Sequence, residues 1–124
     1  FKIILKNIAN IDNINTCNYN TSHETLLLCV TRFNNLDMIK DVLKYRPNLH
    51  IKNSHNNTCF DLRIKYSNYE NGYYSNKDLL IIKEFLNYDK TIFNPYVFNL
   101  KYVNPDREDY EYFKNFYQNF DKKR

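Results

Sequence analysis

Histidine and cysteine side chains are the ones in this chain that could hold a metal ion, and there are three of each. Cys17 stands near His23 in the sequence, and His55 stands near Cys59. If the loops that carry them stack side by side, the four side chains approach one another, as a tetrahedral zinc site requires. Neither pair, however, has the tight spacing of a zinc knuckle. We therefore expect solvated histidines, reduced thiols, and no metal or other cofactor.

The sequence gives no sign of phosphate binding or nucleophilic catalysis. Its single glycine, Gly72, cannot build a glycine-rich phosphate-binding loop. No serine or cysteine stands in a recognisable nucleophile motif. Acidic residues such as Asp61 are better explained as helix caps or as partners of the helix dipole. We predict a protein that is not an enzyme and has no small-molecule substrate.

A tyrosine-rich segment is a stronger functional candidate, and its members are Tyr69, Tyr73 and Tyr74. Tyrosine is common in protein interfaces because it combines a large contact area with a polar tip. Two alternatives stay open. The tyrosines could fold back on the body of the protein, or they could stack the bases of single-stranded nucleic acid together with Lys65 and Lys77.

The elements that position these side chains repeat along the chain. Residues 25–29 match residues 58–62 at a spacing of 33, and residues 38–43 match residues 81–86 at a spacing of 43. The ten extra residues are assigned to a polar insertion near 67–77, which lacks apolar periodicity and is predicted to be a loop. A period near 33 with two short helices per unit is typical of a stacked-repeat solenoid.

The segment 20–52 resembles an ankyrin repeat. Residues 25–30 stand where that family has Thr-Pro-Leu-His-x-Ala, and residues 36–43 match its second helix, x-Glu-Ile-Val-Lys-Leu-Leu-Leu. Residues 47–50 stand for Ala-Asp-Val-Asn, and residues 58–62 resemble the variant Thr-x-x-Asp-Leu. We expect the first helix to begin at Glu24 or Thr25, and the second to run from Leu36 or Asp37 to Tyr45, because capping residues and apolar spacing fit these bounds.

The chain departs from the ankyrin pattern at several positions. Asn34-Asn35 replaces Gly-His, and Arg46 replaces a glycine. Arg63 stands where a small alanine packs in the family. Because the chain has so little glycine, its turns must rely on asparagine and aspartate, which tolerate left-handed backbone geometry.

The resemblance implies an all-α fold, an ankyrin-like helix-pair solenoid of two to three repeats with a C-terminal helical cap. Residues 1–88 would hold a half repeat (1–14), a repeat (20–52) and a repeat with the insertion (53–88). It also implies a non-catalytic adaptor or scaffold that binds another protein through hairpin tips and inner helices. In this chain those positions are Thr21, Ser22, His23, Glu24, Arg32, Phe33, Ser54, His55 and Asn57.

Residues 89–124 are predicted to seal the end of the stack. The apolar segment 91–103 should pack in extended form, and a helix should begin at Asn104-Pro105. An aromatic stripe follows at helical spacing: Tyr110, Phe113, Phe116 or Tyr117, and Phe120. This helix could cap the last repeat or dock in a groove of another protein. A membrane-surface helix is disfavoured, because its acidic first turns would meet anionic lipid.

Composition limits the class of protein. The net charge is +4, and Lys122, Lys123 and Arg124 supply three positive charges at the very end, so nucleic-acid binding is expected only within an assembly. No stretch approaches the roughly 20 apolar residues that cross a bilayer. We expect an intracellular, cytoplasmic protein, in the host cell if it is viral, because the bias toward Asn, Ile, Lys and Tyr fits an AT-rich genome. Since the chain begins without Met in an expected helix, we expect further repeats upstream.

A second function stays open at this stage. The chain could be an accessory structural subunit of a large assembly, such as a ribonucleoprotein, anchored by its aromatic C-terminal segment.

Overall fold

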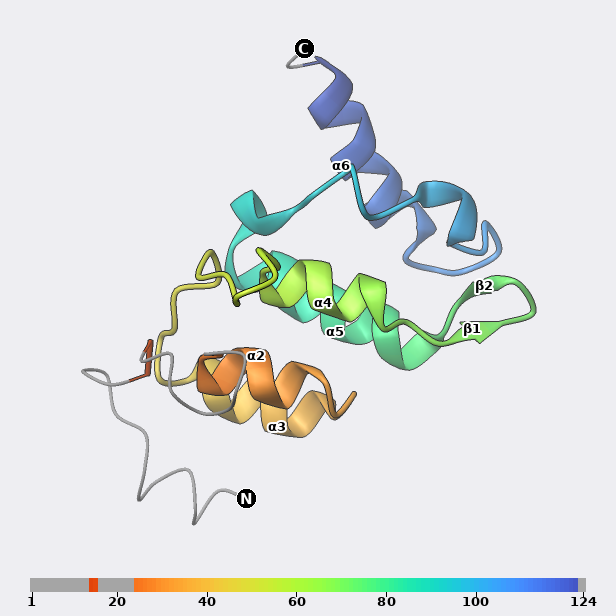
Figure 1. Cartoon of the computed structure of the whole chain (residues 1–124). Helices are drawn as coiled ribbons and strands as arrows, with labels where there is room; N and C mark the ends of the chain where they lie inside the picture. Colours follow the sequence, from red (N-terminus) through yellow and green to blue (C-terminus); the bar gives the residue numbers. More distant parts are fainter. Residues whose placement is uncertain (1–13, 16–23, 123–124) are drawn as a thin grey trace.

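The computed structural model describes residues 14–15 and 24–122 (Figure 1). Most of the expected half repeat and three candidate site residues, Thr21, Ser22 and His23, lie outside the described residues. The described part is mostly helical and has one small two-stranded sheet. The prediction of an all-α class is therefore confirmed.

The first helix pair is α2 (Leu26–Thr31) and α3 (Leu36–Leu43). The Thr25 hydroxyl caps α2 by accepting a hydrogen bond from the Leu28 amide at 3.2 Å. The Asn35 side chain caps α3 in the same way by accepting from the Met38 amide. Asn34 turns the chain between them at a φ of 53°, a left-handed conformation that asparagine tolerates. The prediction of both helices is confirmed, although α3 ends earlier than expected.

The second helix pair is α4 (Cys59–Lys65) and α5 (Asn76–Tyr88). A capping box begins α4: the Thr58 hydroxyl accepts from the Asp61 amide while the Asp61 carboxylate accepts from the Thr58 amide. The Ser75 hydroxyl begins α5 by accepting from the Asp78 amide. Both helices thus start where a hydroxyl side chain can satisfy a free amide of the first turn.

The polar insertion is not the plain loop that was predicted. It forms a β-hairpin of β1 (Tyr69–Glu70) and β2 (Tyr73–Tyr74), paired in antiparallel register. Asn71 and Gly72 connect the strands with φ values of 54° and 83°. Two consecutive left-handed residues suit a tight hairpin turn, and Asn-Gly is the pair that most favours one. The last two residues assigned to the insertion belong to α5.

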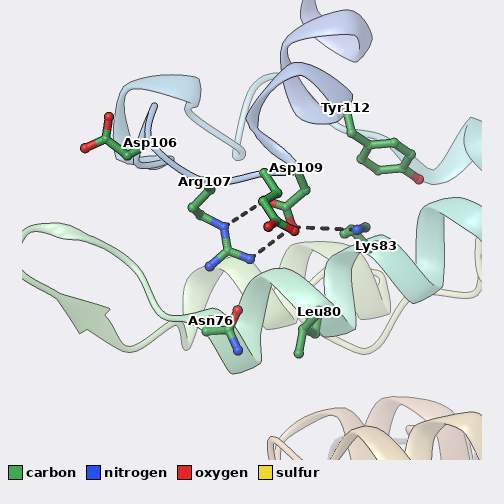
Figure 2. Close-up of a pocket in the computed structure, with 8 residues that line it drawn as sticks. Asn76, Leu80, Lys83, Asp106, Arg107, Asp109 and Tyr112 are labelled. Carbon is green, nitrogen blue, oxygen red and sulfur yellow. Dashed lines mark hydrogen bonds and ion pairs between the residues drawn. The ribbon is translucent and has the colours of Figure 1, made fainter.

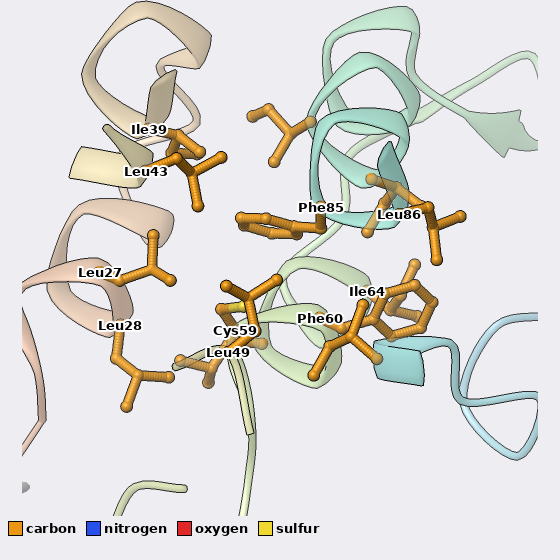
Figure 3. Close-up of a cluster of buried hydrophobic side chains, with 14 of the residues drawn as sticks. Leu27, Leu28, Ile39, Leu43, Leu49, Cys59, Phe60, Ile64, Phe85 and Leu86 are labelled. Atoms are coloured by element: carbon orange, nitrogen blue, oxygen red, sulfur yellow. The ribbon is translucent and has the colours of Figure 1, made fainter. Parts of the chain in front are cut away.

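The two helix pairs lie side by side, with α2 against α4 and α3 against α5 (Figure 1). Phe85 of α5 points toward Ile39 and Leu43 of α3 (Figure 3), and it has no exposed surface. Val42 and Leu86 are also fully buried, as the apolar spacing predicted. Each helix pair therefore covers an apolar face of the other pair, which neither pair could bury alone.

The C-terminal third consists of η1 (Lys90–Ile92), η2 (Leu100–Tyr102) and α6 (Tyr110–Lys122), where η denotes a 3-10 helix. The prediction that a helix begins at Asn104 is wrong. The Asn104 side chain accepts from the Asp106 amide at 2.9 Å, and its carbonyl accepts from the Arg107 amide. These local bonds close a turn instead of starting a helix, a known alternative for asparagine.

Aromatic side chains attach α6 to the rest of the molecule. Phe113 of α6 is fully buried, and its ring centre lies 5.5 Å from that of Phe98. Phe116 stacks on Phe93 at 5.2 Å, and Tyr117 meets the same ring edge-on. The described part of the aromatic stripe thus faces the protein body.

Candidate functional site

A groove of about 360 Å³ runs along α4 and brings together residues from three parts of the chain. One wall is α4 with the turn before it. The other wall combines the β-hairpin with the segment around η2. We call it the α4 groove, and its lining residues are Asn57, Asp61, Ile64, Lys65, Tyr69, Tyr74, Val97 and Tyr102.

A stack of three rings builds the aromatic wall of the α4 groove. Tyr69 stacks on Tyr74 with ring centres 5.6 Å apart, and Tyr74 stacks on Phe98 at 5.3 Å. Tyr102 sets its ring nearly perpendicular to the first two. Because neighbouring rings fix one another, this wall is held in one arrangement.

Burial separates the roles of the tyrosines. Tyr69 is 55% exposed, whereas Tyr74 is 4% exposed. Burial raises the pKa of Tyr74 to about 12, and its hydroxyl accepts a hydrogen bond from the Asn99 amide. Tyr74 was predicted to contact a partner, but its side chain is buried. Its ring packs against one face of the Tyr69 ring and holds that ring in place. Tyr73 is half-buried on the same strand.

The helical wall is fixed by Asp61, whose two carboxylate oxygens are both engaged. One accepts from the Thr58 amide at 3.1 Å and the other from the Asn94 side-chain amide at 2.9 Å. The second bond ties the C-terminal segment to α4. Since its oxygens are occupied, Asp61 shapes the groove and does not present a free carboxylate to it.

Lysine ammonium groups supply the available charge at the groove. Lys65 lines it and is exposed. The Lys101 ammonium lies 5.0 Å from the centre of the Tyr102 ring, a cation–π distance. Glu70 follows Tyr69 on β1, and successive strand residues point to opposite faces. The charge of Glu70 contributes to the raised pKa of Arg107, after the larger effect of the hydrogen bond to Asp109.

Glu24 was proposed as a partner contact, but it is fully buried. Its carboxylate pairs with Arg32 at 2.7 Å and accepts a hydrogen bond from the Asn53 side chain at 2.8 Å. The hydrogen bonds that Arg32 donates to Glu24 raise the pKa of the Arg32 guanidinium, which also lies over the Tyr66 ring. Glu24 therefore holds Arg32 and the inter-repeat turn in place and cannot touch a partner directly.

The other predicted contacts lie at two ends of the helix pairs. Ser54 and His55 are exposed in the turn that leads into α4, at one end of the pairs (Figure 1). Phe33 is 66% exposed at the opposite end, where it lines a separate hollow of about 530 Å³ with Lys77. Of the predicted residues, Asn57, Tyr69 and Tyr74 meet in the α4 groove.

A buried ion pair lies between the helix pairs. The Arg63 Nε and the Asp78 Oδ1 are 3.0 Å apart, and both side chains are about 2% exposed or less. Arg63 also donates to the Thr31 and Tyr66 carbonyls, and burial lowers its pKa. The arginine that replaces a small residue of the ankyrin pattern thus joins α2, α4 and α5.

A further hollow, of about 750 Å³, lies between α5 and the start of α6 (Figure 2). Its cations face inward to one carboxylate: Asp109 lies 2.8 Å from Arg107 and 3.7 Å from Lys83. The hydrogen bond from Arg107 is the main cause that lowers the pKa of Asp109. Since this carboxylate already pairs with both cations, we interpret the cluster as a clamp that holds α6 on α5.

In the described part of the chain, the groups that could do covalent or metal chemistry are not arranged for it. Burial raises the pKa of the Cys59 thiol far above its usual range, so it stays protonated. His50 contacts Thr91 at 2.8 Å and Asp89 at 3.3 Å through the same ring nitrogen, whereas a catalytic triad uses both nitrogens. Within the described ranges, no three His, Cys, Asp or Glu side chains gather as a metal site.

The residues that sequence analysis missed come from packing between distant segments. Val97 and Tyr102 were assigned to an extended sealing segment, and nothing in their local pattern links them to α4. Ile64 carried a usable signal, because it lies one helical turn after Asp61.

In the part of the chain that the structure describes, no helix has both the length and the apolar character to cross a bilayer. No protein-family model, curated protein or solved structure matches the chain.

Proposed function

We propose that the chain is a non-catalytic protein–protein interaction module, an ankyrin-type adaptor or scaffold that binds another protein through the α4 groove. The observation that carries this proposal is the combination of a fixed floor and an exposed rim. Tyr74 and Asp61 are held by internal hydrogen bonds, while Tyr69 and Val97 remain 55% and 39% exposed. A preformed site of this kind loses little entropy when a partner binds.

The ankyrin-like part of the proposal is supported by the order and packing of the elements. Each pair has a short threonine-capped first helix and a longer second helix, and the pairs lie side by side. Arg46 has a φ of 58° at the position where ankyrin repeats have glycine. Inner helices such as α4 are where such repeats generally receive their partners.

A free adaptor is favoured over an accessory subunit of a large assembly or ribonucleoprotein. An anchoring role would need an available aromatic stripe on α6, but Phe113 is fully buried and Phe116 and Tyr117 pack on Phe93. We also propose an intracellular, cytoplasmic location, with which the protonated and buried Cys59 thiol is compatible.

Affinity capture from cells that express the protein tests the function. Three baits are compared: the wild-type chain, the groove variant Val97→Asp, and the variant Leu80→Asp on α5. Leu80→Asp is a matched control, because the side chains of Val97 and Leu80 are exposed to a similar extent, 39% and 37%. Circular dichroism should show equal folding of all three. We expect at least one protein that the wild type and Leu80→Asp capture reproducibly and Val97→Asp does not. Capture of the same set by all three, or of nothing reproducible, would contradict the proposal.

A further inference from the structure

We propose that the α4 groove receives a short, extended, acidic segment of its partner protein. An apolar side chain of that segment would lie against Tyr69 and Val97, and its carboxylates would pair with Lys65 and Lys101. This inference rests on the proposed function and names the chemistry of the partner.

The dimensions of the groove favour an extended segment. Its helical wall runs from Asn57, in the turn before α4, to Lys65 at the end of α4. The six helical steps of α4 span about 9 Å, and the two residues before the helix lengthen the wall by a few Å more. An extended chain advances about 3.3 Å per residue, so about four residues fit along this wall. A volume near 360 Å³ is at the small end of ligand sites and too small for a folded element.

Charge complementarity points to acidic side chains. Within the described residues, neither Lys65 nor Lys101 forms an ion pair. Lys65 lines the groove, and the Lys101 ammonium lies over the ring of Tyr102, which also lines it. The one acidic side chain that lines the groove, Asp61, has both oxygens occupied by internal bonds. A carboxylate placed there would therefore meet two ammonium groups against the single negative charge of Asp61, whose oxygens are turned to internal donors.

The exposed apolar surface at the same rim requires an apolar partner group. Tyr69 has one ring face covered by Tyr74, and its side chain is still 55% exposed. Val97 contributes further apolar surface from the C-terminal segment of the same wall. A leucine- or phenylalanine-sized side chain between them would remove this surface from water, at roughly 25 cal/mol per Å².

Single-stranded nucleic acid fits the groove less well. Successive bases need several open ring faces and a row of cations. Tyr74 lies between Tyr69 and Phe98, so neither of its faces is open. Lys77, which the sequence suggested as a second cation for nucleic acid, lines the separate hollow at Phe33 instead.

The experiment selects a random peptide library, displayed on phage, against the folded chain. The selected peptides are then titrated by fluorescence anisotropy against the wild type, Lys65→Glu, Lys101→Glu and Lys40→Glu. Lys40→Glu is the matched control, because it makes the same charge change away from the α4 groove. Lys40 is an exposed residue of α3 and lines a separate hollow with Tyr88. A labelled uridine oligonucleotide is titrated in parallel.

We expect the selected peptides to combine acidic residues with an apolar one. Lys65→Glu and Lys101→Glu should each weaken binding about tenfold, while Lys40→Glu leaves it within about twofold. Selection of basic or uncharged peptides, equal loss in Lys40→Glu, tighter binding of the oligonucleotide, or no selection would overturn the inference. Failure of the inference is distinguishable from failure of the function, since Val97→Asp can still lose a captured protein when charge reversal has no effect.

Discussion

At the scale of the residue, Arg63 shows how this chain tolerates a charged side chain in its core. Its guanidinium meets Asp78 at 3.0 Å and donates to two carbonyls, so three contacts compensate for the loss of water. Removal of one partner would leave the other charge buried without compensation. The net stabilisation from the Arg63–Asp78 pair is therefore smaller than the stability that is lost when one of the two residues is removed.

We predict that Arg63→Ala lowers the free energy of unfolding by about 3–5 kcal/mol. Urea denaturation followed by circular dichroism measures the change. Lys65→Ala, an exposed change on the same helix, serves as the control and should stay within about 0.5 kcal/mol of the wild type. A loss below about 1 kcal/mol for Arg63→Ala would mean that water reaches this ion pair.

At the scale of the element, the position of α6 depends on its aromatic face and on the Asp109 clamp. Asp109 lies at the start of α6, and its cations come from the preceding turn and from α5 (Figure 2). Arg107 and Lys83 lower the pKa of Asp109 in the folded protein. The pKa of Asp109 is therefore lower in the folded protein than in the unfolded chain. The ion pairs of Asp109 stabilise the fold fully at a pH above the unfolded pKa, and this stabilisation is lost as the pH falls through the folded pKa.

We predict that Asp109→Asn lowers the free energy of unfolding at pH 7 by about 1 kcal/mol. The difference from the wild type should shrink as the pH falls below about 4, the usual pKa of aspartate. Urea unfolding between pH 7 and pH 3 measures it. Asp106→Asn, an exposed change in the same turn, should leave the free energy at pH 7 nearly unchanged. A difference that does not depend on pH would contradict the clamp.

How much the sequence predicts differs between elements. Hydroxyl and asparagine caps predict where α2, α3 and α4 begin, because capping is a local interaction. The hairpin was missed although Asn71-Gly72 is a strong local turn signal, since the polar composition around it suggested a loop. The burial of Glu24 and Tyr74 had no local signal, because it depends on Asn53 and Phe98 from distant parts of the chain.

At the scale of the whole molecule, the helix pairs and the C-terminal segment share a continuous core. Phe98 contacts Phe60 of α4, Tyr74 of the hairpin and Phe113 of α6. This one buried ring joins the three elements, and a shared close-packed core couples their unfolding. We therefore expect the described elements to unfold as one unit.

We predict that Phe113→Ala costs about 3–5 kcal/mol and moves the entire transition, even though the residue lies in the last helix. Far-ultraviolet circular dichroism reports on the helices, and tyrosine fluorescence reports on the packing of the tyrosines, which are spread over several elements. The two transitions should coincide in the wild type and in the variant. Tyr96→Ala, at a side chain that is 79% exposed, is the control. A separate early transition of α6 would show that it is only loosely attached.

Nuclear magnetic resonance tests most directly whether the α4 groove is the binding surface. A selected peptide is titrated into the isotope-labelled chain, and the amide shifts are mapped onto the structure. We predict that the largest changes fall on Ile64, Lys65, Tyr69 and Tyr102, while Lys40 and Leu43 on α3 stay unchanged. Changes centred on α3 or on the hollow at Phe33, with the groove unaffected, would contradict the assignment of the binding surface.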